Sequence, residues 1–352
     1  MSSPKRALIA VAVVVCALGV TAAVYLYRLH RPLVDTSSGP APSILAELPS
    51  DAPAIAYLDV AALRKLQNSP LSAVLGLTKN GSQTDREYAD FVRDTGFDYT
   101  RDLDQAAIAF WPTSLAPEAN AAGDDPALAI ADGRFDQQKI EAYAVRAGGR
   151  TEQHGNRKIY IVPGNPVVSF EFLSPKRIAI ASGKKSPELL NISAEGQRGP
   201  AMQTRINRVA GSPVFAVART SDLPAGFYAN LAKSPELDHL VRSIQGLSLS
   251  GQPQGDQIHV ALDAECDSMK NAFEMSTILD GFRLIGSMSL SDPKTRRQLQ
   301  MTREQAAFLE ALIKAAKVSQ QDRWVRIGLD LTPEMLGESA QPNSNHAPAG
   351  RR

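Results

Sequence analysis

An apolar run near the N-terminus, Ala7 to Tyr27, places the strongest constraint on how this chain can fold. The run contains no charged residue and no proline. As an α-helix it would be about 31 Å long at about 1.5 Å per residue, which matches the hydrocarbon core of a bilayer. Apolar runs of this length rarely form buried helices in soluble domains. We therefore predict a transmembrane helix over residues 7–27.

A cleaved signal peptide is the alternative for this run. Lys5 and Arg6 form a short basic region before it, and Val20-Thr21-Ala22 resembles a cleavage site. The apolar run continues past that site, however, and its end from Tyr25 to Arg31 combines aromatic and basic residues, as membrane-interface anchors do. We favour an uncleaved signal-anchor, which leaves the N-terminal tail in the cytoplasm and the large domain outside the membrane.

The composition of the chain describes a globular protein. Of 352 residues, 43% are hydrophobic and 21% are charged, and the formal net charge is +1. This charge gives no basic footprint for nucleic-acid binding. Outside the apolar run the chain has one cysteine, Cys266, so the soluble part cannot close an internal disulfide.

Pro, Gly and charged stretches divide the chain into segments. The alternating apolar and polar runs between these breaks predict short strands and helices in mixed order. The expected segments are a cytoplasmic tail (1–6), the transmembrane helix (7–27), a linker (28–48), a first α+β unit (49–195), a second α+β unit (209–337) and a disordered tail (338–352). The polar stretch 195–208 is the expected boundary between the units.

The two expected units resemble each other in the order of their elements. Asp132 and Asp136 precede a predicted helix with the spacing Asp-x3-Asp-x2-Lys, and Asp263 and Asp267 precede another with the same spacing. Common Asp caps explain such a match as well as a duplication does. The expected fold class is α+β: a transmembrane helix followed by two similar layered units, each with a mostly antiparallel sheet and helices on one face. Asp132 and Asp263 are expected to have structural roles.

The sequence contains no complete catalytic, phosphate-binding or metal-binding motif. Residues 182–186 read Ser-Gly-Lys-Lys-Ser but lack the first glycine of a phosphate-binding loop, so a polar strand-to-helix turn is expected. Ser291 and Lys294 fit Ser-x-x-Lys without the partner motifs of penicillin-recognising enzymes. The five histidines are scattered, and His259 is expected to be a satisfied strand histidine. No catalytic, cofactor-binding or metal-ligating residue is predicted.

The stretch from Leu48 to Asp59, which contains Leu-Pro-x-Asp-Ala before a predicted strand, resembles single-pass bacterial envelope proteins of unknown function. The resemblance carries no catalytic residue. It implies a membrane-anchored extracytoplasmic protein, and we expect a binding or scaffold protein of the cell envelope with an envelope protein as partner. Two alternatives remain open: an extracytoplasmic hydrolase with an unrecognised active site, and a solute-binding module with its cleft between the halves.

Overall fold

The computed structural model describes residues 41–65, 86–111, 126–191, 198–222, 235–255, 257–291, 303–332 and 335. The expected cytoplasmic tail, transmembrane helix and disordered tail lie outside these residues, as does the expected linker up to residue 40. Among the helices that are described, none combines the length and the apolar character needed to cross a bilayer.

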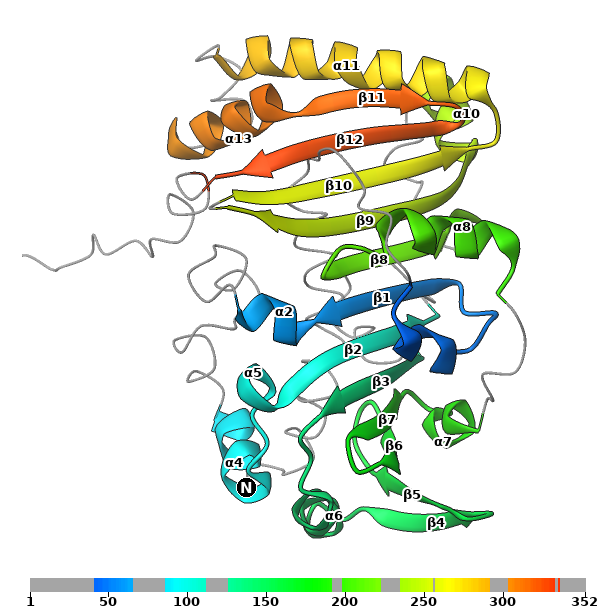
Figure 1. The fold of residues 1–352 in the computed structure, drawn as a ribbon. Coiled ribbons are helices and arrows are strands. Elements are labelled where there is room, and N and C mark those ends of the chain that lie inside the picture. The colour runs from blue at the N-terminus through cyan, green and yellow to red at the C-terminus, as the bar shows by residue number, and fades with distance from the viewer. Residues whose placement is uncertain are drawn as a thin grey trace, which may run out of the picture.

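The centre of the structure is one sheet of twelve strands (Figure 1). All of its strand pairs are antiparallel, and the order is β11-β12-β10-β9-β8-β1-β2-β3-β7-β6-β5-β4. The strands are β1 (Ala54–Asp59), β2 (Leu103–Phe110), β3 (Ala127–Gly133), β4 (Arg150–His154), β5 (Arg157–Val162), β6 (Val168–Ser174), β7 (Arg177–Ser182), β8 (Val214–Arg219), β9 (Ile244–Gln254), β10 (Gln257–Cys266), β11 (Lys317–Gln321) and β12 (Trp324–Leu331).

The expectation of two similar units with separate sheets is wrong, because β1 pairs with strands from both halves. Its residues face β2 on one side and β8 on the other, with Tyr57 opposite both Ala107 and Phe215. We call the β1–β8 pairing the seam. β1 is apolar on both of its faces, so it can serve as a central strand covered on each side. A strand with two hydrogen-bonded neighbours leaves no free edge there, and the halves share one sheet.

Helices cover both faces of the sheet, whereas the sequence led us to expect them on one face. Leu58 points into one apolar cluster and Tyr57 into another, as alternation along a strand requires. The first face is covered by α2 (Val60–Arg64), α4 (Arg86–Thr95), α5 (Tyr99–Asp102), α6 (Gln137–Arg146), α10 (Pro235–Arg242), α11 (Met269–Ser291) and α13 (Arg303–Ala315). The second face is covered by η1 (Ser43–Glu47), α7 (Ser186–Leu190) and α8 (Pro200–Val209). A short turn, η2 (Thr220–Asp222), follows β8.

Several elements begin and end where the sequence signals them. The Asp136 carboxylate accepts a hydrogen bond from the Lys139 backbone N–H and caps α6, as expected. Gly96 ends α4 with a φ of 75°, a left-handed conformation that glycine adopts without strain. In contrast, α8 lies within the polar stretch expected to be a boundary, and η1 lies at the end of the expected linker.

The strand plan is the same on either side of the seam. On one side β1, β2 and β3 pair in sequence, α6 follows, and β7 returns beside β3; on the other, β8, β9 and β10 pair in sequence, α11 follows, and β12 returns beside β10. The backbone N–H of Asp59 donates to the Pro213 carbonyl over 2.7 Å, and that of Arg219 donates to the Pro53 carbonyl over 2.9 Å. These reciprocal bonds extend the seam at both ends.

Candidate functional site: a polar row and a pocket at the seam

A row of mostly polar residues crosses the second face of the sheet at one end of its strands. Residues opposite each other on paired antiparallel strands point to the same face, so the row follows from the strand register. From β12 to β7 the polar row contains Asp330, His259, Gln252, Pro213, Asp59, Gln105, Asp132 and Arg177.

Hydrogen bonds connect the first-half members of the polar row. Tyr57 lies two residues before Asp59 on β1 and points to the same face of the sheet. Its hydroxyl donates to Gln105 Oε1 over 2.9 Å. Gln105 Nε2 donates to Asp132 Oδ2 over 2.9 Å, and Arg177 donates to both Asp132 oxygens over 2.6 and 2.9 Å. Hydrogen bonding from Arg177 holds the pKa of the Asp132 carboxyl below its usual value. Arg177 also donates to Glu47 of η1 over 3.0 Å, which ties that element to the sheet.

The second-half members form two further pairs. His259 Nδ1 lies 2.7 Å from Asp330 Oδ1, and the Asp330 carboxylate also lies 3.7 Å from the Lys317 ammonium. The imidazole is buried, and its Nε2 atom makes no hydrogen bond within the described part of the chain, so only one nitrogen of the ring has a partner there. Gln252 Nε2 donates to the Ser212 hydroxyl over 3.1 Å, which fixes the loop before β8 against the end of β9.

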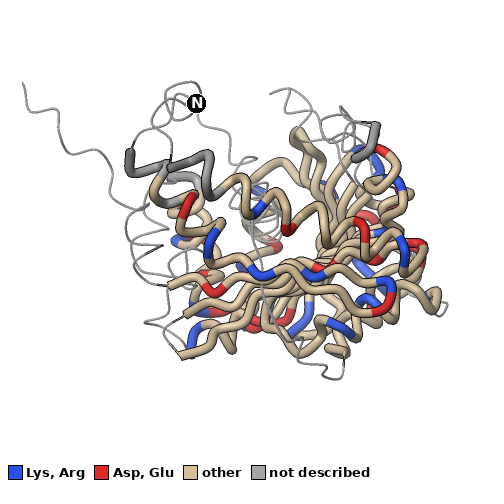
Figure 2. The backbone as a smooth tube through the Cα atoms, turned by 90° about the horizontal axis from the view of Figure 1, so that it is seen from above, with Lys and Arg blue, Asp and Glu red and all other residues tan. Residues whose placement is uncertain are grey.

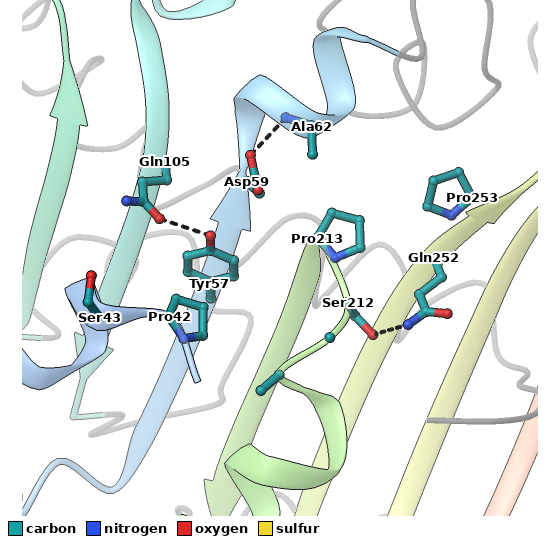
Figure 3. Close-up of a pocket in the computed structure, with 12 residues that line it drawn as sticks. Pro42, Ser43, Tyr57, Asp59, Ala62, Gln105, Ser212, Pro213, Gln252 and Pro253 are labelled. Atoms are coloured by element: carbon teal, nitrogen blue, oxygen red, sulfur yellow. Dashed lines mark hydrogen bonds between the residues drawn. The ribbon is translucent and has the colours of Figure 1, made fainter. Parts of the chain in front are cut away.

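An open pocket of about 690 Å³ lies in the middle of the polar row (Figure 3). Both halves of the chain contribute to it, because the β1–β8 seam runs beneath it. Its walls are formed by Pro42, Ser43, Tyr57, Asp59, Ala62, Gln105, Ala210, Gly211, Ser212, Pro213, Gln252 and Pro253. The volume falls in the range of small-molecule sites.

The charge at this pocket is negative. Asp59 is the one charged residue among the described residues of its wall, and Asp59 Oδ1 accepts a hydrogen bond from the Ala62 backbone N–H over 2.7 Å, which caps α2. Burial raises the pKa of the Tyr57 hydroxyl, and the negative charges of Asp59 and Asp132 raise it further. The hydroxyl is therefore neutral at physiological pH, and it acts as a hydrogen-bonding group rather than a nucleophile.

The two aspartates singled out in the sequence both form ion pairs with an arginine opposite them on the neighbouring strand. Asp132 pairs with Arg177 in the polar row, whereas Asp263, which is fully buried, accepts from Arg326 Nε and Nη2 over 2.7 and 3.0 Å. Arg208 of α8 lies 3.6 Å from Asp263. The structure therefore gives both aspartates a structural role, at two separate places on the sheet.

The remaining motifs do not assemble into a site. Residues 182–186 form the turn between β7 and α7, as expected, and Ser186 is buried with its hydroxyl 2.8 Å from that of Ser169. Ser291 ends α11, and Lys294 lies outside the described residues. Within the described ranges, no group of three or more His, Cys, Asp or Glu side chains is placed to bind a metal ion.

The sequence left open a solute-binding cleft between the halves, but none of the residues that line this pocket was identified from it, although one signal for them was present. Tyr57 and Asp59 are polar groups two residues apart in an otherwise apolar strand, so both point to one face near the strand's end. Gln105 and Gln252 gave no comparable signal, because their approach depends on which strands pair. A second pocket, of about 400 Å³ between α10 and α11, is lined mainly by apolar atoms and includes Phe273.

The chain matches no protein-family model and no curated protein sequence. Three crystal forms of TP0453 are similar in structure. Form III has a TM-score of 0.46 with 11% identity, covering 86% of this chain and 98% of that one. Form IV has a TM-score of 0.46 with 11% identity and coverages of 85% and 96%, and form I has 0.43 with 12% identity and coverages of 85% and 98%. These values are too low to transfer a site or a function.

Proposed function

We propose that this protein is a membrane-anchored, extracytoplasmic binding protein of the bacterial cell envelope, and that the pocket at the seam holds its ligand. The observation that carries the proposal is the position of the pocket in the polar row, with walls from both halves of the chain. The expected anchor, residues 7–27, ends shortly before η1. Pro42, which precedes η1, and Ser43, its first residue, both line the pocket.

The pocket is suited to binding because its polar groups are fixed in place before a ligand arrives. Tyr57 is held by Gln105, Gln252 by Ser212, and Asp59 by the N-terminus of α2 (Figure 3). Preorganised polar groups between apolar walls are typical of small-molecule sites, since little conformational entropy is lost on binding. Pro42, Pro213 and Pro253 supply such rigid walls.

The hydrolase alternative draws on the His259–Asp330 pair, which has the geometry of a general base oriented by a carboxylate. A hydrolase of this kind needs a nucleophile next to the second imidazole nitrogen. His259 Nε2 has no hydrogen-bond partner, and hence no nucleophile, among the residues that the structure describes. The pair therefore gives less support to catalysis than the pocket gives to binding.

The pocket can be tested by filling it. Ser43 is exposed on η1 and lines the pocket, so a Ser43→Trp indole would occupy the space without disturbing the core. We expect at least one member of a panel of envelope amines, sugars and amino acids to raise the Tm of the full chain by a few degrees at about 100 times its Kd. The Ser43→Trp variant should lose this shift.

Ala46 provides the matched control, because it is exposed on the same short element but does not line the pocket. The Ala46→Trp variant should keep the ligand-induced shift in full. If the same ligand stabilises Ser43→Trp and the native chain equally, it binds elsewhere, and if no panel member raises the Tm, the binding proposal fails.

The expected anchor makes a separate prediction about topology. With residues 7–27 as a signal-anchor, the folded part should be digested when protease is added to bacterial cells whose outer barrier has been permeabilised, while cytoplasmic marker proteins stay intact. Replacing three central apolar residues, Ala12, Val14 and Leu18, by Asp should release the chain from the membrane fraction. A protease-resistant folded part in such cells would contradict the extracytoplasmic location.

A further inference from the structure

The polar row contains three aspartates, and they differ in one respect. Asp132 is paired with Arg177, and Asp330 is paired with His259 and lies near Lys317. Asp59, between them, forms no ion pair with a basic side chain of the described residues, and it is the aspartate that borders the pocket. Resting on the proposed function above, we infer that the ligand of this pocket carries a cationic group, an ammonium or a guanidinium, which binds the Asp59 carboxylate.

The second carboxylate oxygen of Asp59, Oδ2, is available to accept a hydrogen bond, because the helix cap uses only Oδ1. Oδ1 accepts the Ala62 N–H at 2.7 Å, and no residue of the described chain donates to Oδ2. A carboxylate has about four acceptor positions, so capping uses a minor part of its capacity. A donor in the pocket can therefore bond to Asp59 without displacing α2.

The surroundings favour a cation over an anion. Among the described residues of the pocket wall there is no Lys, Arg or His, so none of them would offset the charge of an anionic ligand. Asp132 lies behind Gln105 and adds to the negative potential, although Arg177 neutralises it in part. Burial is the main cause of the raised pKa of Tyr57, and the negative charges of Asp59 and Asp132 raise it further, which is consistent with a negative potential at the pocket.

The size and composition of the pocket describe the rest of the ligand. A volume of about 690 Å³ is far larger than an ammonium group needs. The rings of Pro42, Pro213 and Pro253 and the Tyr57 ring offer apolar surface, whereas the Ser43 and Ser212 hydroxyls offer hydrogen bonds. The ligand class is therefore a cationic group on an apolar stem with one or more further polar groups.

Three probes with a shared 4-hydroxyphenyl scaffold separate charge from shape: tyramine is a cation, tyrosol is neutral and 4-hydroxyphenylacetate is an anion. Saturation-transfer NMR on the full chain in nanodiscs, with empty nanodiscs as background, would give their Kd values. We expect tyramine to bind about tenfold tighter than tyrosol, because a hydrogen bond to a charged group is added. The anion should bind more weakly than both.

The Asp59→Asn variant isolates the charge, because asparagine caps a helix as well as aspartate does. Its Tm should equal that of the native chain, and its Kd for tyramine should rise to that for tyrosol. Asp136→Asn is the matched control: the same substitution at a helix cap outside the pocket wall should leave tyramine binding unchanged.

The outcomes separate this inference from the proposed function. If all three probes bind equally and Asp59→Asn has no effect, the pocket binds ligands but does not select a cation. Tighter binding of 4-hydroxyphenylacetate, or no binding of tyramine, also overturns the cationic ligand. The Ser43→Trp comparison decides independently whether the pocket binds anything.

Discussion

Single side chains hold this sheet together through buried ion pairs. Arg205 of α8 and Glu265 of β10 are almost fully buried, with Arg205 Nε 2.7 Å from Glu265 Oε2, and Arg323 lies 2.7 Å from Glu265 Oε1. The Arg205 guanidinium lies directly on Gly246 of β9 and donates to the Gln245 carbonyl over 3.0 Å. A glycine is required at this position because the guanidinium occupies the space where a side chain would start.

The Gly246→Ala variant tests this contact. A Cβ atom at position 246 would lie 2.0 Å from Arg205 Nε, so the guanidinium would have to leave Glu265. Glu265 would keep Arg323, but the buried Arg205 guanidinium would lose its carboxylate partner, and we expect a loss of about 3 kcal/mol in the free energy of unfolding, measured by urea denaturation.

Gly251, on the same strand, is the control for this variant. A Cβ there would meet the Val214 Cβ at 3.9 Å, an ordinary contact, so Gly251→Ala should change the stability by less than about 1 kcal/mol. Equal stability of the two alanine variants would show that Arg205 can move away from Gly246 at no cost.

At the scale of elements, α8 is a packed helix in a stretch where the sequence predicted a boundary. Its polar composition, with Gly199 and Pro200 at its start, favoured a boundary between units. The helix nevertheless buries Met202, Ile206 and Val209 at helical spacing against the second face of the sheet. Three large apolar residues among ten are too few to identify a helix from composition, but they suffice once the sheet offers an apolar surface.

The small turn elements were easier to predict, because local chemistry specifies them. Asp136 at the start of α6 and Gly96 at the end of α4 act within a single turn of chain. The polar row is different in kind. Neighbouring members are as far apart along the chain as Asp59 and Pro213, 154 residues, and only strand pairing brings them together.

At the scale of the whole molecule, the shared sheet implies that the two halves unfold together. The chain contains two tryptophans, Trp111 after β2 and Trp324 at the start of β12, so each half has its own fluorescent reporter. We expect Trp111→Phe and Trp324→Phe variants to show coincident urea transitions, because loss of either half exposes the β1–β8 seam.

The reporters would contradict this picture if they gave two separated transitions, one for each half, at midpoints that differ beyond the effect of the substitutions. Circular dichroism on each variant supplies the control, since it follows the whole sheet and should agree with the fluorescence.

The distribution of charge does not divide the halves either. Figure 2 shows Lys and Arg interspersed with Asp and Glu along the described chain, in keeping with the net charge of +1.

The sequence by itself determined local features of this protein: the cap of α6 at Asp136, the turn at residues 182–186, and the structural roles of Asp132 and Asp263. These depend on periodicity and on contacts within one or two turns of chain. The tertiary structure decided that β1 joins two halves in one sheet, that helices cover both faces, and that Tyr57, Gln105 and Gln252 surround a pocket beside Asp59. Strand partners are chosen by burial of both faces and by register between distant segments, and a single sequence does not state those choices.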